Sequence, residues 1–262
     1  LSKAKNLNSV VVAISDSKND DPLAEHINTL GYDLFRGSEN DVLARYYEAA
    51  KRLEPDAVVR ITGDCPLIDP TLVDSVIEKF FESNADYASN IEPPTYPDGL
   101  DIEVFKYNLL KDSFINAKTS LEREHVTTFI RNNKNYNKVF LVNKLNLSNE
   151  RWTVDEPEDF EVISQIIKYF QPDIHFNWEQ ILELKSLEPS LFKTNQHIKR
   201  NEGATMGKGQ KLYKKAKKII PGGTMLLSKR PEMFLPDYWP SYYSKSKGCK
   251  VWDLDNNEYI DM

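Results

Sequence analysis

Short apolar runs alternate with amphipathic segments along the first part of the chain, and this alternation constrains the fold more than any other feature of the sequence. Residues 10–14 and 57–62 are rich in β-branched side chains and predict strands of the kind that is buried on both faces of a parallel sheet. A shorter strand is predicted at 33–35. Each of these strands is followed by a predicted helix with one apolar face: 20–30, 42–53 and 69–80. Strands that alternate with helices are typical of an α/β fold with a mainly parallel sheet and helices on both faces.

From residue 86 onward the pattern is less regular and predicts a mixed sheet. The strands expected there are 86–90, 100–105, 139–142 and 151–154. The helices expected there are 106–117, 120–132 and one that begins at the acidic stretch 155–159. Together these elements predict one α/β domain.

A polar, aperiodic stretch at 186–206 predicts a linker. Beyond it, 210–220 predicts a short basic amphipathic helix, and 250–253 with 258–260 predict a hairpin segment. The expected organisation is a domain at 1–185, a linker at 186–206 and a further segment at 207–262.

The composition excludes several classes of partner. With 34 Lys and Arg against 40 Asp and Glu, the net charge of -6 gives no general attraction to nucleic acid or to an anionic membrane. Cys65 and Cys249 are the only cysteines, and they lack the spacing of a zinc site or a disulfide framework. No apolar run approaches the ~18–20 residues of a membrane span, and no signal-peptide pattern opens the chain. We therefore expect a cytoplasmic protein that binds neither nucleic acid nor membrane.

Asp64 lies just past the end of the predicted strand 57–62, where open α/β sheets place their ligand crevices. The preceding Gly63 lets a backbone come close to a ligand. Magnesium uses one or two carboxylates and takes its other oxygens from water and substrate phosphates, so Asp64 is a candidate metal ligand. Asp also suits turns and helix caps, and position alone favours neither interpretation.

Asp155 occupies a similar place, after the predicted strand 151–154 and before a helix. It is the candidate for a second metal carboxylate. The stretch Asp-Glu-Pro-Glu-Asp is also typical of a well-capped helix start, and taken alone Asp155 fits that role better.

Five motifs occur in one order along the chain. They are FRGSENDVL at 35–43, RITGDCPLIDP at 60–70, PDGLDIEV at 97–104, EREHVT at 122–127 and RWTVDEPED at 151–159. In this order they resemble the spore coat polysaccharide biosynthesis protein F family, which is similar to the CMP-acylneuraminate and 3-deoxy-manno-octulosonate cytidylyltransferases. The resemblance implies a Rossmann-like, three-layer nucleotidyltransferase fold of the GT-A-like type, with a mixed, mainly parallel sheet.

The resemblance also implies roles for individual residues. Asp64 and Asp155 would be the catalytic metal carboxylates. The residues implied at the nucleotide pocket are Arg36, Gly37, Ser38, Asp41, Arg60 and Gly63. The residues implied on the side of the sugar, the acceptor or the phosphates are Asp98, Asp101, Glu103, Arg123 and His125. Asp98-Gly99 is also a common turn pair, and Arg123 and His125 also fit a solvated helix face.

The implied reaction is attack by a sugar hydroxyl or sugar phosphate on the α-phosphorus of CTP, with Mg²⁺ and release of pyrophosphate. It would serve bacterial surface polysaccharide synthesis, with nucleotide and sugar substrates as partners and a homodimer as the assembly considered. The family begins with a strand and a Gly-, Ser- and Arg-rich loop that ends in lysine and wraps the triphosphate. The sequence contains no such loop before Leu1. We therefore expect this chain to bind nucleotide weakly and to turn over poorly.

The last part of the chain has a resemblance of its own. LYKKAKKIIPGGT at 212–224 and KGCKVWDLDNNEYID at 247–261 resemble the N-terminal arm of class III aminotransferases similar to glutamate-1-semialdehyde aminomutase. Those enzymes use pyridoxal phosphate (PLP). The lysine that forms the Schiff base with PLP would lie beyond Met262, so no PLP site is assigned.

Three hypotheses follow. The first is a CTP-dependent sugar nucleotidyltransferase. The second is a bifunctional protein that is chiefly a PLP-dependent aminotransferase with an accessory first domain, and the third is a structural or binding module. Asp64 and Asp155 together favour the first, because an accessory domain needs neither.

Overall fold

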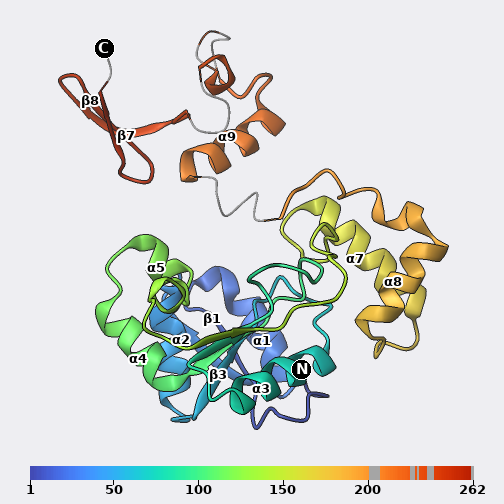
Figure 1. The fold of residues 1–262 in the computed structure, drawn as a ribbon. Coiled ribbons are helices and arrows are strands. Elements are labelled where there is room, and N and C mark those ends of the chain that lie inside the picture. Colours follow the sequence, from blue (N-terminus) through green and yellow to red (C-terminus); the bar gives the residue numbers. More distant parts are fainter. Residues whose placement is uncertain (201–206, 225–227, 229, 235–238, 261–262) are drawn as a thin grey trace. The chain divides into compact units, whose positions relative to one another are not determined.

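The computed structural model describes residues 1–200, 207–224, 228, 230–234 and 239–260 (Figure 1). The chain divides into two compact units, Leu1–His197 and Ile198–Met262. Each unit is described by itself. None of the helices in the described residues has the length and apolarity that crossing a membrane requires.

The first unit contains alternating strands and helices. Its strands are β1 (Val11–Ser15), β2 (Asp33–Gly37), β3 (Ala57–Arg60), β4 (Tyr87–Ser89), β5 (Glu103–Lys106) and β6 (Lys138–Phe140). Its α-helices are α1 (Asp21–Thr29), α2 (Val42–Lys51), α3 (Pro70–Glu82), α4 (Tyr107–Asn116), α5 (Ser120–Glu124), α6 (Thr128–Asn132), α7 (Pro157–Phe170) and α8 (Trp178–Leu187). Two short 3-10 helices are η1 (Lys18–Asp20) and η2 (Pro189–Phe192).

The strands pair in two sheets. β1 and β2 form a parallel pair, and the larger sheet has the order β3-β5-β4-β6. In the larger sheet β5 runs antiparallel to β3 and β4, whereas β4 and β6 are parallel. β3, β4 and β6 therefore share one direction. The α/β class with a mixed, mainly parallel sheet is confirmed.

The alternation of side chains along the strands separates two apolar cores. On β4 and β5, Ala88 and Val104 belong to one core, and Tyr87 and Phe105 belong to the other. Residues of α3, α7 and α8 complete the first core, and residues of α2, α4 and α6 complete the second. Figure 1 shows α2 and α4 together on one side of this unit. Helices thus cover both faces of the sheet, which gives the three layers.

Asp69 shows how the sequence sets a helix start close to the loop of Asp64. Its carboxylate accepts hydrogen bonds from the backbone N–H groups of Thr71 and Leu72 at the start of α3 (2.7 and 3.2 Å). The second oxygen accepts from the backbone N–H of Trp178, which begins α8 (3.0 Å). Asp69 therefore caps α3 and ties it to α8.

Two of the elements expected from the sequence differ from those in the structure. The helix expected at 120–132 is two helices, α5 and α6, because the backbone at Val126 turns to φ 46° while its side chain is fully buried. The strand expected at 151–154 was wrong. Trp152 and Val154 donate their N–H groups to the carbonyls of Asp98 and Asp64, in two separate loops, so no ladder forms.

The chain around the expected linker is largely folded within the described residues. α8 runs to Leu187, and the side chains of Phe192 and Asn195 are buried. The division between the units lies after His197, and residues 201–206 are outside the described residues.

The second unit contains α9 (Lys208–Ile219), the 3-10 helix η4 (Pro231–Met233) and the strands β7 (Tyr243–Lys247), β8 (Lys250–Asp253) and β9 (Glu258–Ile260). The expected helix and hairpin are confirmed, with Val251 opposite Tyr259. β7 was missed, because its five residues are all exposed and show no apolar alternation.

Candidate active site

The structure brings the loops of Asp64 and Asp155 together. The carbonyl oxygen of Asp64 accepts hydrogen bonds from the backbone N–H of Val154 (2.9 Å) and from the hydroxyl of Thr153 (3.1 Å). The residue after Val154 is Asp155. The two carboxylates, far apart in sequence, therefore project from one hydrogen-bonded frame.

The Asp64 carboxylate is oriented by its own loop. The Thr62 hydroxyl donates to Oδ1, and the Cys65 thiol donates to the same oxygen (3.4 Å). Burial raises the pKa of Cys65 to about 12, so the thiol stays protonated at neutral pH. Within the part of the chain that the structure describes, Oδ2 of Asp64 accepts no hydrogen bond. α3 is capped by Asp69, so Asp64 is not a helix cap.

Asp155 does not cap its helix either. The N-cap of α7 is Glu156, which forms a capping box with Asp159. Oδ2 of Asp155 accepts from Nη2 of Arg151 (3.0 Å), and the side chain is 52% exposed. Burial and the negative charge of Asp64 together raise the pKa of Asp155. The carboxylates are thus close enough to repel each other.

Two carboxylates in this arrangement fit a divalent cation that completes its shell with phosphate oxygens and water. Each has one oxygen held by the protein, at Asp64 by Thr62 and at Asp155 by Arg151. A group of three or more acidic, Cys or His side chains able to hold a metal is absent from the described residues. The metal roles of both residues stay predictions.

Asp155→Asn is expected to raise the free energy of unfolding at pH 7 by up to about 1 kcal/mol. The pKa of Asp155 is raised in the folded state, so its charged form opposes folding at pH values above that pKa. The gain should vanish as the pH falls below about 4, where the carboxylate is protonated in both states. Thermal unfolding of the variant and the wild-type chain at pH 7 and pH 3 measures this gain. A lower melting temperature of the variant at pH 7 would contradict the prediction.

Arg151 organises the acidic residues beside Asp155, and the sequence did not reveal this. Its guanidinium is buried and bonds Asp159 with Nε and Nη2 (2.8 and 2.7 Å) and Asp98 with Nη1 (3.1 Å). Asn195 donates to Asp159 as well (2.9 Å). The carboxylate of Asp98, expected on the sugar side, is thus engaged by Arg151.

Glu103, also expected on the sugar side, lies inside the domain. It is 2% exposed and accepts from Arg60 (2.5 Å), Tyr87 (2.7 Å) and Thr127 (2.6 Å). Burial raises its pKa, but the charge of Arg60 and the two hydroxyl donors outweigh this and lower it. Glu103 and Arg60 therefore form a buried ion pair, and their substrate roles stay predictions.

Arg36 orders the loop after β1. Its Nε and Nη2 donate to the carbonyls of Ser15 (3.1 Å) and Ser17 (2.8 Å), and Nη1 pairs with Asp21 (2.6 Å). Gly37 pairs with Ser15 at the end of β2. Their contact with a nucleotide stays a prediction.

Asp41 and Arg123 pair with each other. Nε of Arg123 lies 3.0 Å from both carboxylate oxygens, and its Nη1 donates to the carbonyl of Phe114 (2.8 Å). Asp41 also caps α2 through the N–H of Ala44 (2.9 Å), and its own N–H donates to the hydroxyl of Ser38 (3.1 Å). The pair joins α5 to the start of α2, and a substrate role for either residue stays a prediction.

The remaining expected residues lie at three places. Gly63 is exposed beside Asp64, and His125 follows α5 as its half-buried C-cap. Asp101 lies between the buried residues Leu100 and Ile102, and its substrate role stays a prediction.

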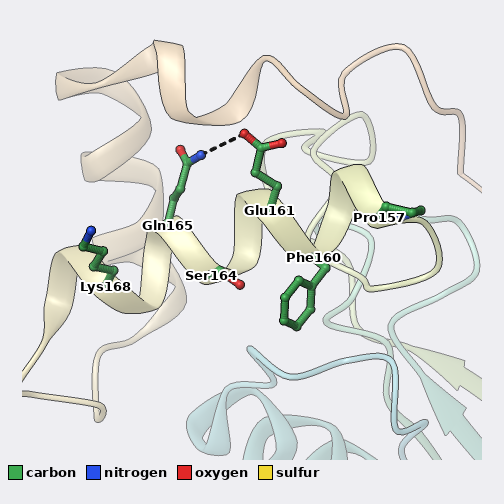
Figure 2. Close-up of a pocket in the computed structure, with 6 residues that line it drawn as sticks. All are labelled: Pro157, Phe160, Glu161, Ser164, Gln165 and Lys168. Atoms are coloured by element: carbon green, nitrogen blue, oxygen red, sulfur yellow. Dashed lines mark hydrogen bonds between the residues drawn. The ribbon is translucent and has the colours of Figure 1, made fainter.

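A hollow of about 360 Å³ lies along α7. Figure 2 shows its six lining residues, all from α7, with Gln165 donating to Glu161 (3.2 Å). Neither Asp64 nor Asp155 lines it. The hollow is therefore not the candidate site.

Gly99 allows the loop of Asp98 to lie against the chain that carries Asp155. Its φ is 100°, and a Cβ there would lie 2.5 Å from the carbonyl carbon of Trp152. Gly99→Ala is expected to lower the free energy of unfolding by about 2–4 kcal/mol through backbone strain and overlap. Denaturant unfolding measures it. Gly31→Ala is the matched control, because φ there is 77° with no atom within 4 Å, and an equal loss in both variants would contradict the overlap.

A three-layer α/β domain in which hydrogen bonds join the loops of Asp64 and Asp155 fits the framework of a nucleotidyltransferase. The chain belongs to the cytidylyltransferase family, whose model matches residues 1–201. It is 36% identical to an uncharacterized protein of Methanocaldococcus jannaschii, over 76% of this chain and 82% of the relative. It is 35% identical to the spore coat polysaccharide biosynthesis protein SpsF of Bacillus subtilis, over 62% and 68%. A solved cytidylyltransferase of Leptospira borgpetersenii superposes with a TM-score of 0.70 and 32% identity, over 74% of this chain and 82% of that one.

Shorter matches connect part of the chain with a different class of enzyme. A 3-aminobutyryl-CoA aminotransferase of Cloacimonas acidaminovorans is 37% identical over 61 residues, which span 14% of that relative. A glutamate-1-semialdehyde 2,1-aminomutase of Methanococcoides burtonii is 40% identical over 57 residues, 12% of its length.

Proposed function

We propose that the first unit transfers CMP from CTP to a sugar acid or sugar phosphate, with release of pyrophosphate, in the biosynthesis of a bacterial surface polysaccharide. The observation that carries the proposal is the frame in which Val154 and Thr153 hold the carbonyl of Asp64. This frame joins the loop of Asp64 to the stretch that leads into Asp155, which supports a shared role for the two carboxylates. The name of the Bacillus subtilis relative supports the polysaccharide pathway.

In the proposed reaction an oxygen of the sugar substrate forms a bond to the α-phosphorus of CTP. The bond from that phosphorus to the bridging oxygen breaks, and pyrophosphate leaves with its electron pair. A hydroxyl acceptor gives its proton to solvent. Asp64 and Asp155 would hold Mg²⁺, which when bound neutralises charge on the phosphates. The chain thus aligns reactants and supplies no nucleophile.

The experiment is pyrophosphate release by the 262-residue chain from each of the four NTPs, with Mg²⁺ and a panel of sugar acids and sugar phosphates. A second protein carries, before Leu1, the Gly-, Ser- and Arg-rich loop that the family resemblance implies. Release that needs CTP and one acceptor, and that rises in the second protein, supports the proposal. Folded proteins that both fail with every nucleotide and acceptor would overturn it.

The short aminotransferase matches favour a second candidate, in which residues 207–262 belong to a PLP-dependent aminotransferase unit and the first unit is accessory to it. A chimera tests this candidate, in which residues 207–262 replace the matching N-terminal arm of a glutamate-1-semialdehyde aminomutase. A chimera that folds and binds PLP, seen by the absorbance of the bound cofactor, would favour this candidate. A folded chimera that binds no PLP would oppose it.

A further inference from the structure

We propose that Asn195 is a positioning residue of the candidate site, and that it holds Arg151 and Asp159 in the arrangement that aims Asp155 toward Asp64. The inference rests on the proposed function. Asn195 lies outside the five motifs that carry the family resemblance. It belongs to the stretch that follows η2, close to the end of the first unit.

The carboxamide of Asn195 joins two parts of the site. The side chain is 2% exposed, and Nδ2 donates to the carbonyl of Arg151 (3.1 Å) and to Oδ1 of Asp159 (2.9 Å). One amide group therefore fixes the distance between the residue that begins the Asp155 loop and the first turn of α7.

Asp159 passes this constraint on to Asp155. Its side chain is fully buried, and Oδ2 accepts from the backbone N–H groups of Asp155 (3.1 Å) and Glu156 (3.0 Å). Arg151 bonds the same oxygen and also the Asp155 carboxylate. The backbone and the side chain of Asp155 are thus both set by partners of Asn195.

The neutrality of Asn195 matters for this role. Arg151 faces three carboxylates, those of Asp98, Asp155 and Asp159. Asn195 satisfies one oxygen of Asp159 without a further positive charge, which would compete with a metal for these acids. A neutral donor in this place supports Asp159 and adds no positive charge beside the proposed metal carboxylates.

The test compares Asn195→Ala, Asn195→Ser and Asn177→Ala in the 262-residue chain. Asn177 caps α8 through the N–H of Gln180 and, among the described residues, forms no hydrogen bond with Asp155, Asp159 or Asp98, so it is the control for loss of stability. Binding of Mn²⁺ is followed by electron paramagnetic resonance, with and without CTP, and Mg²⁺ is titrated in the pyrophosphate assay. Melting temperatures show that each variant is folded.

We expect Asn195→Ala to weaken Mn²⁺ binding and raise the half-saturating Mg²⁺ concentration by about 10-fold or more, with a smaller shift in Asn195→Ser, which keeps one donor. The KM for CTP should change less than about twofold, because the buried carboxamide of Asn195 is occupied by Arg151 and Asp159. If the Ala variant fails to fold, the Ser variant decides by the same readouts.

Equal metal affinities in the Asn195 and Asn177 variants would overturn the inference, as would a wild-type chain that binds no Mn²⁺ even with CTP. If the wild-type chain binds Mn²⁺ but neither it nor the protein with the added loop releases pyrophosphate from any NTP, the proposed function fails. The comparison of Mn²⁺ affinities then still decides the role of Asn195.

Discussion

Asp64→Asn is expected to lower the rate of pyrophosphate release about a thousandfold, which corresponds to about 4 kcal/mol of lost transition-state stabilisation. The substitution keeps the size of the side chain and its contact with Thr62, but removes the charge that the proposed metal needs. The measurement is kcat with CTP and the acceptor identified in the panel, at saturating Mg²⁺.

The control is Asp112→Asn, which removes one negative charge from the exposed surface of α4. It should leave kcat unchanged. Because the frame around Asp64 is held through its backbone carbonyl, and because the substitution removes the repulsion with Asp155, Asp64→Asn should not lower the melting temperature of the chain. An Asp64→Asn protein that retains more than about a tenth of the wild-type kcat would contradict the catalytic role.

Arg151→Met is expected to lower the free energy of unfolding by about 3–5 kcal/mol, because it leaves the buried carboxylates of Asp98 and Asp159 without their cation. Burial raises the pKa of Asp159, but Arg151, Asn195 and two backbone N–H groups outweigh it and lower the pKa. That stabilisation is present above the unfolded pKa of about 4 and is lost as the pH falls through the folded value. The cost of the substitution should therefore shrink in acid.

Denaturant unfolding at pH 7 and at pH 3 gives the loss of unfolding free energy at neutral pH and in acid. Arg131→Met is the matched control, since its partner Glu92 is 39% exposed and an ion pair of that kind contributes up to about 1 kcal/mol. Equal losses for Arg131→Met and Arg151→Met at pH 7 would show that burial of the acidic residues does not set the cost.

The sequence predicts those parts of the fold that local chemistry controls. The alternation of strands and helices predicted the α/β class. The family resemblance paired Asp64 with Asp155, and hydrogen bonds join their loops, while the metal roles of both residues stay predictions. The break at Val126 was not predictable, because it depends on the core that encloses this side chain.

The local sequence pattern also could not predict which residues the charged side chains contact. Nothing in the sequence shows that Asn195 contacts Asp159 and Arg151, because it lies 36 and 44 residues from them. The same applies to Glu103, which the motif placed near the substrate and the structure places in a buried ion pair with Arg60. Sequence motifs identify residue types and order, whereas burial depends on the whole chain.

The hydrogen bond from Thr153 to the carbonyl of Asp64 spans 89 residues, and this separation governs when the site can exist during protein synthesis. A nascent chain that has exposed β3 and its loop still lacks the second acid and the groups that hold it. The carboxylates can meet only after the ribosome has released residue 155 and the chain has closed this long loop, which is a slow kind of contact to form. Incomplete translation products would therefore carry Asp64 without the second carboxylate. The proposed metal site could form only after the chain has been synthesised past residue 155.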